Sequence, residues 1–227
     1  MSKIKLVLAT LSGAVGILLI ALTTSVLAGG WGIGVTGNQA YFSTTGTETL
    51  KTNSTKTTGT VDNDVMVPSV YMEYTGDAGW VIGLDYVPGN ATLGAKTTTR
   101  TDKLTDGTGS TVTQKAEADV SDHWTVYAET PAWTALGLYL KAGYTEVTVE
   151  TNENLGTGAA YGNADVSASV VGLGMKRSFG NNALIKLEGT YTDYDSISLS
   201  STGSDVATTI VAEPEAYAVR LSLGYSF

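Results

Sequence analysis

The fold is decided by the last stretch of the chain, which reads YAVRLSLGYSF at positions 217–227. Every second residue of this stretch is apolar or aromatic, whereas the residues between them are small or polar and include Arg220. Such period-two alternation predicts a β-strand with one apolar and one polar face. A charged residue on the polar face and an aromatic residue at the terminus are typical of the closing strand of a transmembrane β-barrel, whose outer face meets lipid.

The opposite end of the chain has the pattern of an export signal. Lys3 and Lys5 precede an uncharged stretch, and Ser25–Ala28 supplies the small residues of a cleavage site. These are the charged, apolar and cleavage regions of a secretory signal peptide. We therefore predict a signal peptide over residues 1–28, with an uncleaved anchor as the alternative, and one domain over residues 29–227.

Composition narrows the class of the remaining chain. After residue 28 no apolar stretch reaches the roughly 18 residues of a membrane-spanning helix. Backbone polar groups cannot stay unpaired in lipid, so a membrane location for this part of the chain requires a closed barrel. The chain has no cysteine, which excludes a disulfide framework, a cysteine-based zinc site and a thiol nucleophile.

Eight segments alternate like half-buried strands, and short and long connections join them in turn. The short connections include glycine-rich hairpin turns such as Thr75–Gly79. The long connections are rich in Thr, Gly, Ser, Asn and Asp, which predicts mobile segments without a packed core. This rhythm indicates an eight-stranded antiparallel up-and-down transmembrane β-barrel, with short turns in the periplasm and long loops outside. The predicted strands are 31–42, 66–74, 80–86, 122–130, 136–144, 169–176, 183–191 and 217–227.

Eight charged residues fall on the predicted inward positions, four acidic and four basic. An eight-stranded barrel is only wide enough for its own side chains to fill, and unpaired buried charges cost several kcal/mol. The balance therefore predicts a lumen charge network; exposed charges on a soluble sandwich are the alternative. The predicted network consists of Glu73, Asp85, Glu129, Glu188, Lys141, Lys176, Lys186 and Arg220.

Two further details concern the lumen. The apolar parity of the fifth strand flips at Val147 and Val149, which predicts a bulge or the point where the strand leaves the bilayer. Small residues also fall on inward positions, where they would open space for water. These residues are Gly83, Gly143, Gly172 and Gly174.

The remaining charge gathers at one end of the predicted barrel. Without the two lysines of the predicted signal, 11 basic residues face 22 acidic residues, a net charge of −11. The excess acid lies in the long connections and beside them, which predicts an acidic extracellular rim that repels nucleic acid. The pairs Asp62/Asp64 and Asp193/Asp195 are candidates for binding divalent cations through carboxylate oxygens, with solvated loop charge as the alternative.

The segment Arg220–Phe227, the signal pattern and the hairpin rhythm together resemble the small eight-stranded outer-membrane barrels, such as OmpX-like proteins, opacity proteins and the transmembrane domain of OmpA. The resemblance implies a place in the bacterial outer membrane, surrounded by lipid. It also implies that Tyr225 and Phe227 form the signal read by the barrel-assembly machinery. Because no peptidoglycan-binding domain follows Phe227, the wall-tethering function of OmpA is not expected.

The sequence offers little for catalysis. The one histidine, His123, has no nucleophile motif beside it at Ser121. The carboxylates of Glu73 and Glu129 could serve acid–base chemistry, but pairing with lysine or arginine explains them more simply. No phosphate-binding or dinucleotide motif is present. We expect no enzymatic activity and no cofactor.

Two functions remain as hypotheses. The first is a structural and surface-interaction barrel with a charge-paired, largely plugged lumen and long acidic extracellular loops that meet partners. The alternative is a narrow porin or channel for small solutes or ions, which the inward glycines keep open.

Overall fold

The computed structural model describes residues 29–50, 54, 56–103, 109–154, 161–180, 182–201 and 208–227, so the predicted signal peptide lies outside the described residues. These residues form an all-β structure with ten strands. Across this part of the chain, no helix has the length and apolar character needed to cross a membrane. The strands are β1 (Gly30–Leu50), β2 (Lys56–Thr75), β3 (Val81–Val87), β4 (Ala91–Lys103), β5 (Gly109–Glu129), β6 (Leu138–Asn154), β7 (Ala164–Phe179), β8 (Ala183–Tyr194), β9 (Ile197–Ser200) and β10 (Thr208–Ser226).

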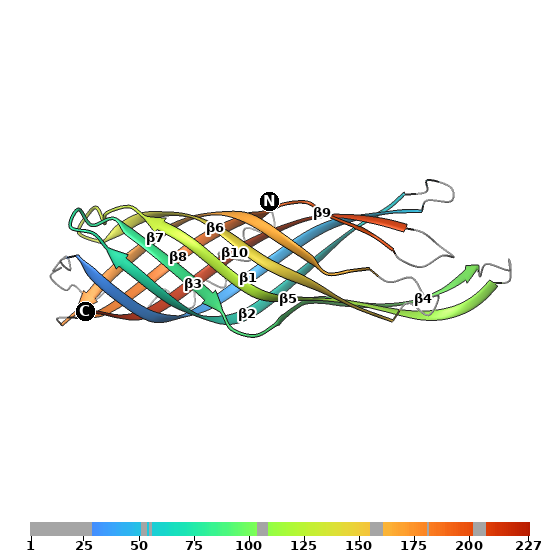
Figure 1. Ribbon diagram of the computed structural model, residues 1–227, viewed down its shortest axis with the longest axis horizontal. Helices are drawn as coiled ribbons and strands as arrows, with labels where there is room; N and C mark the ends of the chain where they lie inside the picture. Colours follow the sequence, from blue (N-terminus) through green and yellow to red (C-terminus); the bar gives the residue numbers. More distant parts are fainter. Residues whose placement is uncertain are drawn as a thin grey trace.

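Eight of these strands close into an antiparallel ring (Figure 1). The order around the ring is β1-β2-β3-β5-β6-β7-β8-β10, and β10 pairs back with β1 from Gly32↔Ser226 to Leu50↔Thr208. The predicted eight-stranded antiparallel up-and-down barrel is therefore confirmed. The two other strands lie outside the ring, where β4 pairs with β5 and β9 pairs with β10.

The long connections contain more structure than their composition predicted. β1 and β2 continue as a hairpin beyond the level where β3 ends, and β4 folds back along β5, at the end of the molecule opposite the C-terminus (Figure 1). The prediction of connections without packed structure is wrong for these described residues. Threonine favours strands, and cross-strand threonine hydroxyls pair here, Thr45 with Thr60 at 3.1 Å and Thr47 with Thr58 at 3.0 Å.

An apolar cluster packs the inner face of the barrel at this end. It is formed by Val120, Val147, Val149 and Val166, which are all buried. The pairing of β6 with β7 is continuous through this level, so the parity flip of β6 marks an apolar interior and not a bulge. The register shift lies instead in β5, between Ser121 and Trp124. Side chains that pack against the cluster are Leu93, Ala118, Ala164, Tyr194 and Ile197.

Around the outside of the ring runs a belt of apolar side chains that no part of the described protein covers. Ile33, Leu140 and Leu223 are each about half exposed, at 51%, 52% and 54%. Aromatic rings pair across strands at both ends of the belt, Trp31 with Tyr74 and Tyr191 with Tyr217. An apolar surface of this extent needs an apolar solvent, so the belt is the surface that lipid covers.

The short turn between β2 and β3 is tight and well bonded. Gly76 N donates to Trp80 O at 2.8 Å, and Gly79 N donates to Gly76 O at 2.8 Å. Gly79 has a φ of 82°, a left-handed conformation that glycine adopts without steric cost. This turn brings β3 back antiparallel to β2.

Candidate functional site in the barrel lumen

Strand alternation directs every second side chain of the ring into the lumen. The structure places all eight of the predicted network residues on this inner face. Seven of them are buried, and Lys176 is half-buried. Charges that are removed from water in this way require partners.

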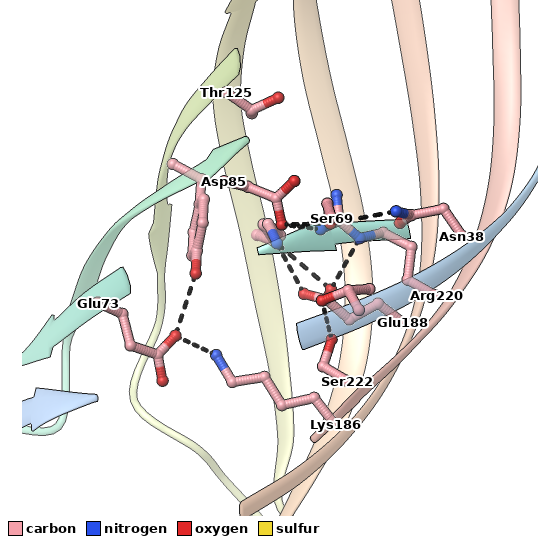
Figure 2. Close-up of polar contacts among 12 residues, drawn as sticks. Asn38, Ser69, Glu73, Asp85, Thr125, Lys186, Glu188, Arg220 and Ser222 are labelled. Carbon is pink, nitrogen blue, oxygen red and sulfur yellow. Dashed lines mark hydrogen bonds and ion pairs between the residues drawn. The ribbon is translucent and has the colours of Figure 1, made fainter. Parts of the chain in front are cut away.

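The first group of partners lies toward the short turns. Lys186 on β8 contacts Glu73 on β2 and also reaches Glu129 Oε1 on β5 at 2.9 Å. Lys176 on β7 adds a second contact to Glu129, at 3.0 Å. Tyr127 donates its hydroxyl proton to Glu73 at 3.1 Å. Figure 2 shows the contact between Glu73 and Lys186.

The second group surrounds Glu188 and Arg220. Glu188 on β8 accepts from Lys141 on β6 at 3.0 Å and lies 3.4 Å from Arg220 Nε on β10. Arg220 also donates to Asp85 Oδ2 on β3 at 2.5 Å (Figure 2). Tyr139 donates to Glu188 at 2.9 Å. The partners of Arg220 are therefore Asp85 and Glu188, an assignment that the sequence left open.

Apart from Arg220–Glu188, these ion pairs join strands that are not neighbours in the ring. Lys186 of β8 contacts β2, and Arg220 of β10 contacts β3, so the side chains cross the lumen. The space around Arg220, Glu188 and Lys186 is filled to the point that no water molecule fits in it. The network thus occupies the lumen at this level.

Three inward tyrosines fill the lumen beside the charge network. No role for them was predicted from the sequence. Tyr71, Tyr127 and Tyr139 each lie over a glycine of the adjacent strand. Lys141 Nζ lies 3.8 Å from the centroid of the Tyr127 ring, a favourable cation–π distance. The expectation that inward glycines open space for water is therefore wrong at Gly83 and Gly174, because tyrosine rings occupy that space.

One substitution tests this packing directly. A Cβ added at Gly83 would lie 2.3 Å from Tyr127 Cζ, so Gly83→Ala displaces the ring and breaks its hydrogen bond to Glu73. We expect a loss of about 1–3 kcal/mol in the free energy of unfolding, measured by urea titration in detergent. Gly37→Ala is the matched control, because a Cβ at Gly37 meets nothing within 4 Å. Equal urea midpoints for the two variants would contradict the proposed packing.

The other candidates from the sequence lie outside the network. His123 lies at the register shift of β5, between Ser121 and Trp124, and lines the same cavity as Arg220. Ser121 donates its proton to Glu150 at 2.6 Å, and Ser43 donates to Asp62 at 2.8 Å. Within the described ranges, no group of three or more histidine, aspartate or glutamate residues is arranged to hold a metal ion.

No protein-family model and no curated protein sequence matches this chain. Among solved structures, the outer membrane protein AlkL in lipid bilayers matches with a TM-score of 0.55 and 14% identity, over 92% of this chain and 94% of AlkL. OprG from Pseudomonas aeruginosa matches with a TM-score of 0.48 and 14% identity, over 89% and 98% of the two chains. The outer membrane protease OmpT from Escherichia coli matches with a TM-score of 0.48 and 9% identity, over 91% and 99%. At 14% identity the likeness to AlkL shows the fold alone, which is that of an outer-membrane β-barrel.

Proposed function

We propose that this outer-membrane barrel is a structural and surface-interaction protein whose lumen is closed by its charge network. The observation that carries the proposal is the packing around Arg220, Glu188 and Lys186, which leaves no room for a water molecule. Buried ion pairs that cross the lumen from β10 to β3 and from β8 to β2 hold that packing in place. A solute cannot pass this level without breaking several of them.

The strands beyond the network supply the interaction surface. The hairpins β1–β2 and β4–β5 extend past the ring and display side chains to the exterior. These two hairpins carry nearly balanced charge, whereas the acidic excess lies in the ends of β6, β7, β8 and β10 at the same end of the barrel. That part of the rim favours cationic partners, including divalent cations bound at carboxylates. Its acidic residues include Glu146, Glu150, Asp165, Asp193, Glu213 and Glu215. The proposal assigns no catalytic role to His123 and no cofactor.

No observation favours the narrow-porin alternative. That function requires a continuous water path, and Tyr127 and Tyr139 fill the space beside Gly83 and Gly174. Swelling of proteoliposomes in isotonic solutions of small sugars and amino acids tests the choice. We expect swelling rates equal to those of empty liposomes. Swelling that depends on solute size and rises with protein content would favour the porin.

The sidedness of the surface can be tested because the chain has no cysteine. Thr57 is exposed on the extended β1–β2 hairpin, and Ala78 is exposed in the short β2–β3 turn. A membrane-impermeant maleimide should label Thr57→Cys on intact cells. It should label Ala78→Cys only after the outer membrane has been permeabilised. The reverse pattern would overturn the proposed orientation.

We propose that Tyr225 and Phe227 form the signal for barrel assembly. Both side chains face outward, with 55% and 66% of their surfaces exposed. Phe227 N also donates to Trp31 O at 2.8 Å, so the last residue takes part in closing the ring. Phe227, a residue of the proposed assembly signal, is thus also hydrogen-bonded where β1 and β10 close the ring.

A further inference from the structure

Between the charge network and the extended hairpins, the lumen encloses a partly open cavity of about 70 Å³, which we name the cup. Its floor is polar and includes Asn38, Asp85 and Arg220. Its walls are mainly apolar, although His123, Thr125, Thr190 and Thr192 also line it. The apolar wall residues include Ala40, Val67, Val87, Val120, Val170 and Ala216.

Two buried atoms of the floor, Arg220 Nε and Asn38 Oδ1, lack a hydrogen bond within the described part of the chain. Arg220 Nε still lies 3.4 Å from Glu188 Oε2 as an ion pair, whereas Asn38 Oδ1 has no such contact. Asn38 is only 6% exposed, and its Nδ2 donates to Val67 O at 3.1 Å and to Ser69 Oγ at 3.2 Å. Ser69 donates its hydroxyl proton to Asp85 at 3.1 Å (Figure 2), so its oxygen can only accept from Asn38. This fixes the orientation of the Asn38 amide. Among the described residues, no donor reaches Asn38 Oδ1. A buried acceptor in this state costs free energy until a donor arrives.

The charged groups of the floor are already paired. Asp85 accepts from Ser69 and Arg220, and Arg220 also lies within ion-pair distance of Glu188. An anionic ligand group would lie beside Asp85 and Glu188, and a cationic one beside Arg220, so either would meet a like charge. A neutral donor, in contrast, can reach Asn38 Oδ1 without breaking any of these contacts.

We propose that the cup binds a short linear amphiphile with a neutral hydroxyl head. The hydroxyl donates to Asn38 Oδ1, and the alkyl chain lies along the apolar walls toward the open side. The cup, at about 70 Å³, is about half the size of an engineered cavity of about 150 Å³ that holds benzene. It therefore encloses only the head and the first carbons of the amphiphile, and the rest of the alkyl chain extends through the open side. The inference rests on the proposed function, since the charge network forms the floor of the cup.

Methyl NMR on the full barrel in lipid nanodiscs tests the proposal with 1-hexanol and n-hexane as probes. The methyl groups of Ala216 and Val87 should shift saturably with the aqueous concentration of 1-hexanol. Those of Val171 and Leu223, which face outward, should shift only linearly as the probe enters lipid. One neutral hydrogen bond predicts that 1-hexanol binds about threefold to tenfold more tightly than n-hexane after correction for partition.

Two variants separate the head group from the cavity. Asn38→Leu should bind both probes with equal affinity, because it removes the acceptor and keeps an apolar wall. Ala216→Phe should abolish saturable shifts for both probes by filling the cup without removing a polar group, so it serves even where Asn38→Leu fails to fold. Val171→Phe on the lipid-facing side is the matched control and should behave like the wild type. Heat-modifiable migration on gels establishes that each variant is folded.

Each other outcome overturns a defined part of the inference. Equal affinity of the wild type for the two probes would overturn the assignment of the head group. Shifts at Ala216 and Val87 that stay linear in the 1-hexanol concentration would overturn the site. Cross-relaxation between these methyl groups and ordered water that persists at saturating 1-hexanol would also overturn it, because water would then still occupy the cup. A barrel that conducts ions yet binds 1-hexanol would overturn the plugged lumen alone, whereas a closed barrel without binding would overturn the cup alone.

Discussion

Glu188→Met is expected to lower the free energy of unfolding by about 3–5 kcal/mol, the cost of removing one partner from a buried ion pair. Glu188 accepts from Lys141 at 3.0 Å and from Tyr139 at 2.9 Å, and both its neighbours lose their acceptor in the variant. Among the described residues, Lys141 makes its ion pair with Glu188. The measurement is urea unfolding in lipid vesicles, followed by tryptophan fluorescence.

The double variant Lys141→Met/Glu188→Met should recover much of this loss. Replacing a whole buried pair by apolar residues of similar size is often neutral or stabilising, and Arg220 keeps Asp85 as its partner. The pair Lys115–Glu117, 2.7 Å apart on the extended part of β5, is the control. The Glu117 carboxylate raises the pKa of Lys115 through a hydrogen bond, yet Glu117→Gln should change stability little because exposed pairs contribute little. A single Glu188→Met variant as resistant to urea as the wild type would mean that water fills the lumen.

Deletion of Phe227 is expected to remove most of the folded barrel from the outer membrane. The deletion removes the proposed assembly signal, an outward aromatic ring and the hydrogen bond from Phe227 N to Trp31 O. The measurement is the amount of heat-modifiable protein in outer-membrane fractions. Phe227→Tyr, which keeps an aromatic terminus and the backbone bond, should assemble at the level of the wild type. Normal assembly after the deletion would remove Phe227 from the proposed signal.

The ring and its inward faces could be predicted from the sequence because both depend on a local period of two. Arg220 and Glu188 fall on inward positions by parity alone, and the structure places them there as Cα partners on β10 and β8. The extended hairpins were not predicted from the sequence, because a threonine-rich composition is also typical of mobile loops. Pairs such as Thr45 and Thr60 show instead that these threonines are strand residues.

The contacts inside the lumen could not be predicted in the same way. Asp85 and Arg220 are separated by 135 positions in the chain, and only the closed ring brings β3 and β10 to opposite walls at one level. The filling of the space beside Gly83 depends on the strand register that puts Tyr127 opposite it. The parity flip at Val147 could be read from the sequence, but its cause could not. The cause is the apolar cluster inside the barrel, to which several strands contribute.

Single-channel recording of the purified barrel in planar lipid bilayers tests the closed lumen most directly. We expect no stable open level in the wild type at moderate voltage and salt, because the network around Arg220 and Glu188 leaves no room for water. Glu188→Met should be recorded beside the wild type, because Lys141 loses its ion pair in this variant and water is expected to hydrate it at the same level of the lumen. Steady, ohmic current steps from the wild-type protein, scaling with the number of inserted barrels, would contradict the account.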